Sequence, residues 1–168
     1  MKTIVMGSDP WAWSLHRHLA ERSRAWGHQV QEVTQPDGER TPYFEAARRV
    51  AVAVNAEPGA VGLVLCGTGM GVSMVANTFP GISCALCENT LAAERSRVLN
   101  NANVLAMGEF LTTPYVAEEI LKVFLATEFL TGIPPELATQ IRSWHQSVAA
   151  MKARITVPGW PQASSSSS

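Results

Sequence analysis

Charge is scarce in this sequence. Only 16% of its 168 residues are Asp, Glu, Lys or Arg, and the formal net charge at pH 7 is −1. Proteins that bind nucleic acid through its phosphates carry a strong excess of basic residues, so the composition predicts no nucleic-acid partner. No apolar run approaches the roughly 18 residues that span a bilayer, which predicts no membrane partner. A surface with so little charge favours an oligomer that buries part of it.

Secretory and disulfide features are also lacking. The short apolar run at the amino terminus ends at the turn-forming residues 7–10, Gly-Ser-Asp-Pro, and does not extend into a signal peptide. The three cysteines are an odd number, which argues against a disulfide framework. Both absences favour a cytoplasmic protein.

Two short patterns have the residue types of a metal site but not the geometry. Cys84 and Cys87 form a CxxC, but they lie in an apolar stretch typical of a strand, where residues three apart face opposite sides. His16 and His18 are two apart in a predicted helix, whereas a zinc pair usually needs a spacing of four. We therefore predict no metal ligand: the cysteines belong to the core and the histidines lie on a solvated face.

The order of apolar and amphipathic stretches predicts an α/β fold. Strands are predicted at 2–6, 30–33, 62–66, 82–87 and 104–107. Helices are predicted at about 11–26, 42–54, 72–77, 90–99, 113–129 and 135–153. Such alternation predicts one parallel sheet with helices on both faces. We expect a three-layer α/β/α sandwich, with a Rossmann-like five-stranded parallel sheet, formed by a single domain at 1–154. An irregular tail at 155–168 ends in serines.

The most informative stretch is the predicted strand 62–66, which ends in Cys66 and is followed by glycines at 67, 69 and 71. Ligands of open parallel sheets bind at the carboxyl ends of strands, where glycine lets backbone N–H groups approach a substrate oxygen. A thiol beside a helix N-terminus can serve there as a base or nucleophile, although a lone cysteine is more often a core residue. The glycine spacing fits neither a phosphate-binding loop nor a dinucleotide-binding turn, so no nucleotide cofactor is predicted.

Several segments together resemble the family of ribose-5-phosphate isomerase B and galactose-6-phosphate isomerase. They are residues 7–9, Tyr43, 65–71, 76–77, 85–87 and 100–108, and the likeness covers roughly residues 2–130. The resemblance implies an isomerase of Rossmann-like fold that interconverts aldoses and ketoses without a metal or cofactor. It also implies a small-molecule carbonyl or sugar substrate and a homodimer or dimer of dimers.

The resemblance assigns roles to individual residues. Cys66 would be the base that moves a proton between adjacent carbons through a cis-enediolate, with Thr68 assisting by hydrogen bonding. Asp9 would hold substrate hydroxyls. The turn at 67–71 would donate N–H groups to the developing oxyanion, commonly the largest catalytic contribution, and Asn100 would reach a neighbouring subunit's site. The implied substrate-binding positions are Ser8, Trp11, Tyr43, Gly67, Gly69, Met70, Gly71, Ser73, Leu99 and Asn100.

Departures from the family pattern bear on the substrate. The histidine that usually follows the aspartate is Pro10, and the histidine credited with opening the sugar ring is Leu99. The arginines that usually bind phosphate are missing after Gly132, with Arg142 as a candidate replacement, and Trp11 stands where the site mouth normally has a small residue. Guanidinium contacts supply much of phosphate recognition. We therefore expect a small open-chain substrate that need not be phosphorylated.

Two alternatives remain open. The chain is a conventional sugar-phosphate isomerase of the ribose 5-phosphate type, or it is a subunit that needs a companion chain, as in the galactose-6-phosphate branch, where two unlike chains share the work. The presence of Cys66, Thr68 and Asp9 argues against a chain that has lost its activity.

Overall fold

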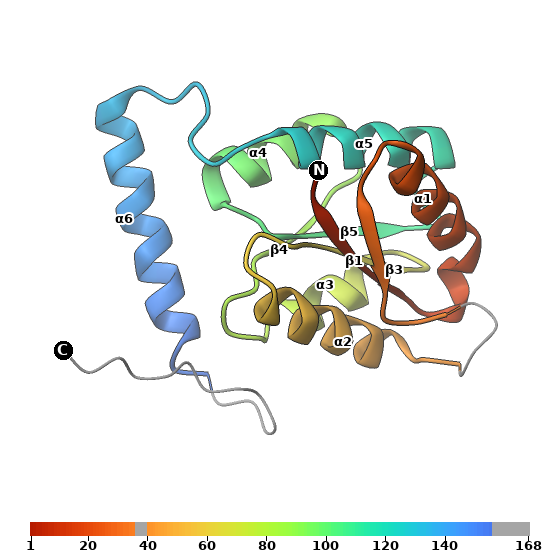
Figure 1. The fold of residues 1–168 in the computed structure, drawn as a ribbon. Coiled ribbons are helices and arrows are strands. Elements are labelled where there is room, and N and C mark those ends of the chain that lie inside the picture. Colours follow the sequence, from red (N-terminus) through yellow and green to blue (C-terminus); the bar gives the residue numbers. More distant parts are fainter. Residues whose placement is uncertain (36–39, 156–168) are drawn as a thin grey trace.

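A five-stranded parallel sheet lies at the centre of the molecule, with helices on both faces (Figure 1). The computed structural model describes residues 1–35 and 40–155. The strands are β1 (Thr3–Ser8), β2 (Gln29–Glu32), β3 (Val61–Cys66), β4 (Cys84–Leu86) and β5 (Val104–Gly108), in the order β2-β1-β3-β5-β4. A short 3-10 helix, η1 (Pro10–Ala12), precedes α1 (Trp13–Ala25), and the other helices are α2 (Tyr43–Ala56), α3 (Met70–Ala76), α4 (Thr90–Asn100), α5 (Pro114–Ala126) and α6 (Pro135–Lys152). The predicted α/β sandwich is confirmed.

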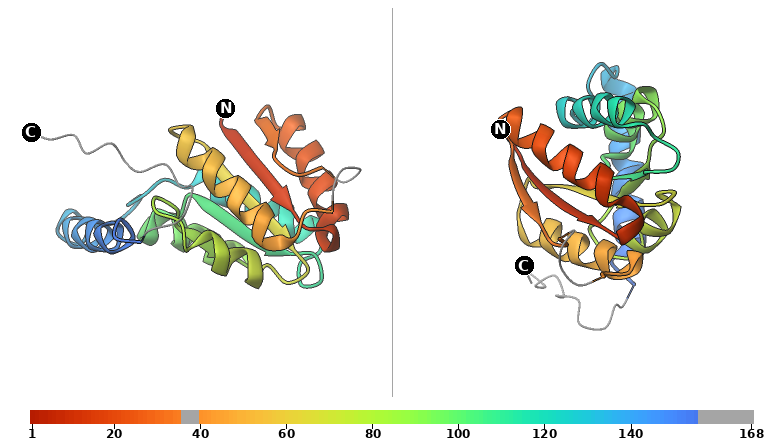
Figure 2. Two further views of the ribbon diagram at one scale, coloured as in Figure 1. Left: turned by 90° about the horizontal axis from the view of Figure 1, so that it is seen from below. Right: turned by 90° about the vertical axis from the view of Figure 1, so that its right-hand side faces the viewer.

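The core consists of two apolar layers, one on each face of the sheet. Side chains alternate along a strand, so Leu63 and Leu65 pack toward α1 and α5, whereas Val64 and Cys66 pack toward α2 and α3. The central strand β3 is therefore buried along its whole length, as its continuous apolar sequence requires. The two views of Figure 2 show helices on both sides of the sheet.

The edge strand β4 is shorter than predicted, because only Cys84–Leu86 pair with β5. The preceding Ser83 bonds instead to the loop before β5, where its N–H donates to the Asn103 side chain at 2.8 Å. The Asn77 side chain covers the free edge: its Nδ2 donates to the Cys84 carbonyl at 2.8 Å and its Oδ1 accepts the Cys84 N–H at 3.0 Å. The backbone groups of Cys84 at the free edge are thus satisfied without a further strand.

The CxxC behaves as the strand geometry predicts. Cys87 belongs to the apolar layer beneath α1 and α5, and Cys84 packs against the opposite layer. Burial raises the pKa of the Cys84 thiol to about 12, which disfavours the thiolate that a metal needs. Within residues 1–35 and 40–155, no three His, Cys, Asp or Glu side chains are placed to hold a metal ion.

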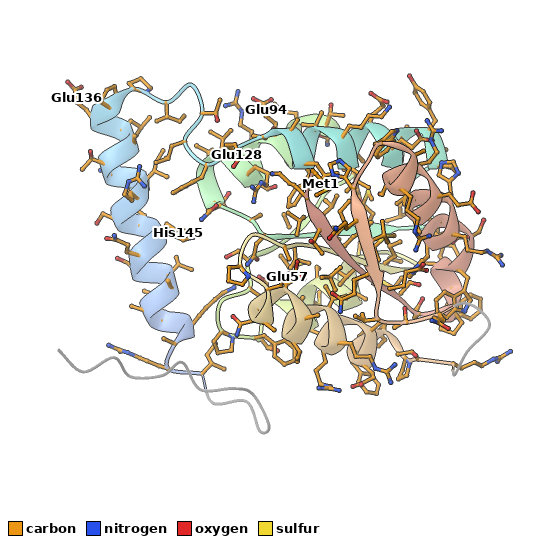
Figure 3. The ribbon with its side chains drawn as sticks, viewed as in Figure 1. Met1, Glu57, Glu94, Glu128, Glu136 and His145 are labelled. Carbon is orange, nitrogen blue, oxygen red and sulfur yellow. The ribbon has the colours of Figure 1, made fainter. Side chains whose placement is uncertain are left out.

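Helix α6 stands beside the sandwich, next to the β4 edge (Figure 1). Lys152, near its carboxyl end, donates to the Asn77 side chain at 3.1 Å and to the Ile82 carbonyl. Figure 3 shows His145 on the side of α6 that faces the sandwich, where its ring lies 5.4 Å from the Phe129 ring. A groove of about 670 Å³ runs between α6 and the sandwich. Apart from Ile155, the predicted tail lies outside the described residues.

None of the helices in the described part of the chain combines the length and the apolar character needed to cross a membrane.

Candidate active site

A cavity of about 300 Å³ opens at the carboxyl ends of β1 and β3. It is lined by Asp9, Trp11, Tyr43, Cys66, Gly67, Thr68, Gly71 and Phe110. The chain leaves β1 for β2 on one side and later enters β3 on the other side, so β1 and β3 flank the point where the strand order reverses. Loops on the two sides of such a point diverge and leave a crevice, which is where open α/β sheets bind ligands. A cavity therefore lies where the Cys66 turn predicts a ligand site.

Cys66 ends β3 and borders this cavity. Cys66 is only 5% exposed, so a ligand can reach its sulfur only through the cavity. The Cys66 Sγ accepts a hydrogen bond from the Gly69 N–H at 3.0 Å, which fixes the position of the sulfur within the turn. The Gly69 N–H points at the sulfur, and Gly69 is not among the residues that line the cavity.

Two of the predicted glycines make room for aromatic rings. A Cβ at Gly67 would lie 2.6 Å from the Phe110 ring, and a Cβ at Gly71 would lie 3.0 Å from the Tyr43 ring. Both distances are shorter than side-chain contacts normally allow, so only glycine lets these rings pack on the turn. The glycine turn therefore shapes two walls of the cavity.

Asp9 lies just beyond β1 with its carboxylate at the cavity. Its Oδ1 accepts the Trp11 N–H at 3.0 Å, which orients the side chain. Burial raises the pKa of Asp9, the Trp11 N–H lowers it, and the charge of Glu109 raises it, with a net upward shift. Thr68 is exposed on the turn, and its hydroxyl oxygen accepts the Met70 N–H at 3.4 Å.

We expect Asp9→Asn to remove a pH-dependent cost to stability. Folding raises the pKa of Asp9, so the folded protein binds this proton more tightly than the unfolded chain. The free energy of unfolding therefore falls as the pH rises from the ordinary value of 3.8 through the raised one. Asparagine keeps the oxygen that accepts the Trp11 N–H but carries no charge.

Urea unfolding at pH 4 and pH 7 measures this effect. The variant should equal or exceed the wild type in stability at pH 7, with a smaller advantage at pH 4. A variant that is less stable than the wild type at pH 7 would contradict the raised pKa of Asp9 in the folded protein.

Besides Gly69, the structure places five predicted binding residues outside the Cys66 cavity. Met70 is exposed, and Ser73 donates its hydroxyl to the Met70 carbonyl at 2.8 Å. Leu99 and Asn100 line the groove beside α6. The fifth, Ser8, lies in the interior. Within one chain, therefore, Asp9, Trp11, Tyr43, Cys66, Gly67, Thr68 and Gly71 come together, and the others do not.

Ser8 belongs to a buried polar network, which corrects the prediction that His16 lies on a solvated face. Its Oγ is 2.7 Å from His16 Nδ1, and His16 Nε2 is 3.0 Å from the Glu32 carboxylate, which also pairs with Arg24. His16 is fully buried because it lies on the face of α1 that packs on β1. The helical spacing could not reveal that a serine at the end of a strand supplies its polar partner. His18, in contrast, is partly exposed and bonds to Glu118 at 2.8 Å.

Phe110 is the site residue that sequence reasoning missed. It follows β5, its N–H donates to the Gly67 carbonyl at 2.9 Å, and its ring centroid lies 6.0 Å from that of Trp11. The available signal was its place two residues after a central strand. Among the described residues of one chain, those that line the cavity include no Lys, Arg or His. Arg142, the candidate phosphate ligand, lies on α6 with its guanidinium 5.9 Å from the Phe129 ring centroid.

Comparison with known proteins gives concordant matches. The sequence pattern of a family described as Ribose/Galactose Isomerase matches residues 4–141. A 4-deoxy-4-sulfo-D-erythrose isomerase of Clostridium sp. strain MSTE9 is 31% identical over 90% of this chain and 96% of its own length. A D-erythrulose-4-phosphate isomerase of Pectobacterium atrosepticum is 35% identical, covering 79% and 88%. The structure of ribose-5-phosphate isomerase B from Clostridium thermocellum superposes with a TM-score of 0.82 at 30% identity, covering 92% of this chain and 99% of that one.

Proposed function

This chain belongs to the ribose/galactose isomerase family and is a sugar isomerase that interconverts aldoses and ketoses, and we propose that Cys66 is its proton-transferring base. The observation that carries the proposal is the place of the thiol. Cys66 is the last residue of a buried strand, and its sulfur accepts a hydrogen bond from the turn that follows. It also borders a cavity that a small sugar can enter.

The residues around Cys66 supply what an enolisation needs. The thiolate removes a proton from the carbon next to the carbonyl, and the electron pair moves onto the carbonyl oxygen to give a cis-enediolate. The thiol then returns the proton to the former carbonyl carbon, while the hydroxyl proton on the neighbouring oxygen passes to the former carbonyl oxygen, so that the carbonyl moves by one carbon. Gly71 lines the cavity in the first turn of α3, where its N–H has no carbonyl partner within the helix and is available to the oxyanion. Asp9 is placed to accept a hydroxyl hydrogen of the substrate.

The proposed substrate is a short sugar in its open-chain form. Two of the relatives are named for four-carbon sugars substituted at carbon 4. Such a sugar lacks the C4 hydroxyl that would close a five-membered ring. The unsubstituted ketose D-erythrulose also stays open, because a ring through its C2 carbonyl and C4 hydroxyl would have only four members, so neither ketose needs a ring-opening residue. Leu99 in place of the expected histidine fits this chemistry. Among the described residues of its own chain, the cavity offers no cation to a phosphate, which supports a substrate without one.

The test is a kinetic comparison by NMR in D₂O. We expect the purified chain to interconvert D-erythrulose and its aldose with incorporation of solvent deuterium at the carbon that loses the proton. Efficient turnover of ribose 5-phosphate without turnover of unphosphorylated open-chain sugars would overturn the substrate assignment and leave the conventional sugar-phosphate isomerase in its place.

We further propose that two copies of the chain associate through the groove beside α6. Leu99 and Asn100 line this groove and do not reach the Cys66 cavity of their own chain, so only a second copy brings Asn100 to a substrate. The groove also carries exposed apolar surface on α6, with Trp144 56% and Val148 47% exposed. Apolar patches of this kind are typical of subunit interfaces.

Trp144→Asp is therefore expected to yield monomers. A carboxylate in a dry interface costs several kcal/mol, enough for a loss of at least about 100-fold in association. Gln146→Asp places the same charge at an exposed α6 position that does not line the groove, and it should leave assembly intact. Light scattering coupled to gel filtration measures the mass. Identical masses for both variants would refute this interface.

A partner-dependent subunit is the second candidate, because the same groove would accept a related chain. Deuterium exchange into D-erythrulose by the purified chain alone favours the self-sufficient enzyme. Exchange that begins only when another chain of the family is added favours the subunit.

A further inference from the structure

A chain of polar side chains runs from the end of β1 through the interior to the surface. Ser8, the last residue of β1, and His16, in α1, are both fully buried. The Ser8 Oγ lies 2.7 Å from His16 Nδ1, and His16 Nε2 lies 3.0 Å from a carboxylate oxygen of Glu32 at the end of β2. The same carboxylate pairs with Arg24. Buried polar groups are costly without partners, and here each one has a partner.

The charges in this network fix where its protons lie. Burial raises the pKa of Glu32, but the bonds and charges of Arg24 and His16 lower it, with a net downward shift, so Glu32 is ionised and only accepts hydrogen bonds. Burial lowers the pKa of His16, Glu32 raises it and Arg24 lowers it, with a net shift below 6.5, so the ring is neutral at pH 7. Its one proton is therefore on Nε2, and Nδ1 accepts the hydroxyl hydrogen of Ser8.

The bond between Ser8 and His16 spans the segment that reaches the Cys66 cavity. Ser8 directly precedes Asp9, and His16 follows η1 in the first part of α1, so the bond joins the two ends of this segment. Asp9 and Trp11 lie between them, and both line the cavity.

Ser8 and Asp9 point to opposite faces of the sheet. Side chains alternate along an extended backbone, and Asp9 continues it with φ of −85° and ψ of 172°. Ser8 points toward α1, where it meets His16, and Asp9 points to the face of Cys66, with which it lines the cavity. The Ser8 N–H also donates to Thr34 Oγ1 at 2.8 Å. The contacts of Ser8 therefore hold the Asp9 carboxylate from the side away from the substrate.

We propose that His16 is a positioning residue of the isomerase, which holds Ser8 so that the Asp9 carboxylate meets the substrate beside Cys66. Glu32 and Arg24 in turn keep the proton on the His16 nitrogen that faces away from Ser8. A displacement of about 1 Å in an active site can cost about 100-fold in rate, so a residue outside the cavity has a large effect through this contact. The inference rests on the roles proposed for Cys66 and Asp9.

The experiment compares two replacements that each keep one half of the imidazole. His16→Asn puts an amide oxygen near the place of Nδ1, where it accepts from Ser8 but does not reach Glu32. His16→Gln puts its amide near the place of Nε2, where it meets Glu32 but not Ser8. We expect kcat/KM to stay within about threefold of the wild type in His16→Asn and to fall about tenfold or more in His16→Gln.

The kinetics use D-erythrulose or D-erythrulose 4-phosphate, whichever the wild type converts faster. Thermal unfolding is measured in parallel, because a merely structural role would lower the melting temperature of both variants and leave the kcat/KM values of the folded proteins alike. His18→Gln is the matched control. His18 lies on the same helix, bonds to Glu118 and does not line the cavity, so its replacement should leave kcat/KM unchanged.

A double variant tests whether His16 acts through Asp9. In an Asp9→Asn background, His16→Gln should lower kcat/KM by less than about twofold further, because the carboxylate that it positions is already gone. Losses that multiply in the double variant would show that His16 does not act through Asp9.

The proton arrangement has a readout that does not depend on activity. In ¹⁵N NMR of the histidine rings at pH 7, we expect His16 as the neutral ring with its proton on Nε2. Ser8→Ala should shift the Nδ1 resonance of His16, because that nitrogen loses its donor. A proton on Nδ1 would contradict the direction of the Ser8 bond and overturn the inference.

The outcomes separate this inference from the proposed function. Equal kcat/KM in His16→Asn and His16→Gln overturns the positioning role, while deuterium wash-in that still depends on Cys66 supports the proposed function. Turnover that survives Cys66→Ala, or no turnover of either sugar, overturns the proposed function and this inference with it.

Discussion

Replacing Cys66 with alanine is expected to lower isomerase kcat by about 10²–10⁴-fold, the usual contribution of a positioned base. Alanine has no group that can remove the proton, while the turn, Asp9 and the rings of Trp11 and Phe110 remain. Deuterium wash-in from D₂O should disappear in parallel, because it reports the proton-transfer step itself. Substrate KM should change little, since the sulfur contributes little to binding the ground state.

The matched control is Cys87→Ala, which removes a thiol that lines neither the cavity nor the groove beside α6. Its kcat should stay close to that of the wild type. Equal losses in the two variants would show that thiol removal acts through folding. Full wash-in by Cys66→Ala would show that another residue is the base.

Gly69→Ala is expected to affect both stability and activity. Gly69 has φ of +75°, where an alanine side chain costs about 1–2 kcal/mol. A Cβ there would also lie 2.6 Å from Leu86 Cδ1 and 2.8 Å from the Met107 carbonyl carbon. Overpacking of this kind adds about 1–3 kcal/mol. The turn must shift to relieve the contact, which breaks the bond from the Gly69 N–H to the Cys66 sulfur and lowers kcat.

Gly59→Ala isolates the backbone cost from the steric one. Gly59 has φ of +86°, and a Cβ there would meet nothing within 4 Å. We expect a loss of only about 1–2 kcal/mol in urea unfolding, with unchanged kcat. If both variants lose the same free energy and keep full activity, the packing around Gly69 does not hold the turn.

The architecture could be predicted because its determinants are local. A continuous apolar run such as 61–66 is typical of a strand buried on both faces, and amphipathic spacing between such runs indicates the covering helices. The place of Cys66 at a strand end beside a glycine turn is equally local. These features need no knowledge of which strands are neighbours.

The sequence could not predict the environment of residues whose contacts come from other segments of the chain. His16 was expected in solvent because its buried partner, Ser8, lies on another element. Strand β4 was predicted too long at its start because the side chain of Asn103, on another segment, takes the backbone N–H of Ser83. In each case a polar side chain from elsewhere in the chain changed the outcome.

The sequence by itself determined the sheet-and-helix order, the strand that presents Cys66, and the turn that follows it. Only the tertiary structure decided what surrounds the thiol. The parallel register of β3 with β5 sets Cys66 opposite Gly108, so that Phe110, two residues further on, packs on the Gly67 turn. Strand pairing fixes such neighbours through long-range hydrogen bonds, whereas residue spacing along the chain reports only what lies on the same element.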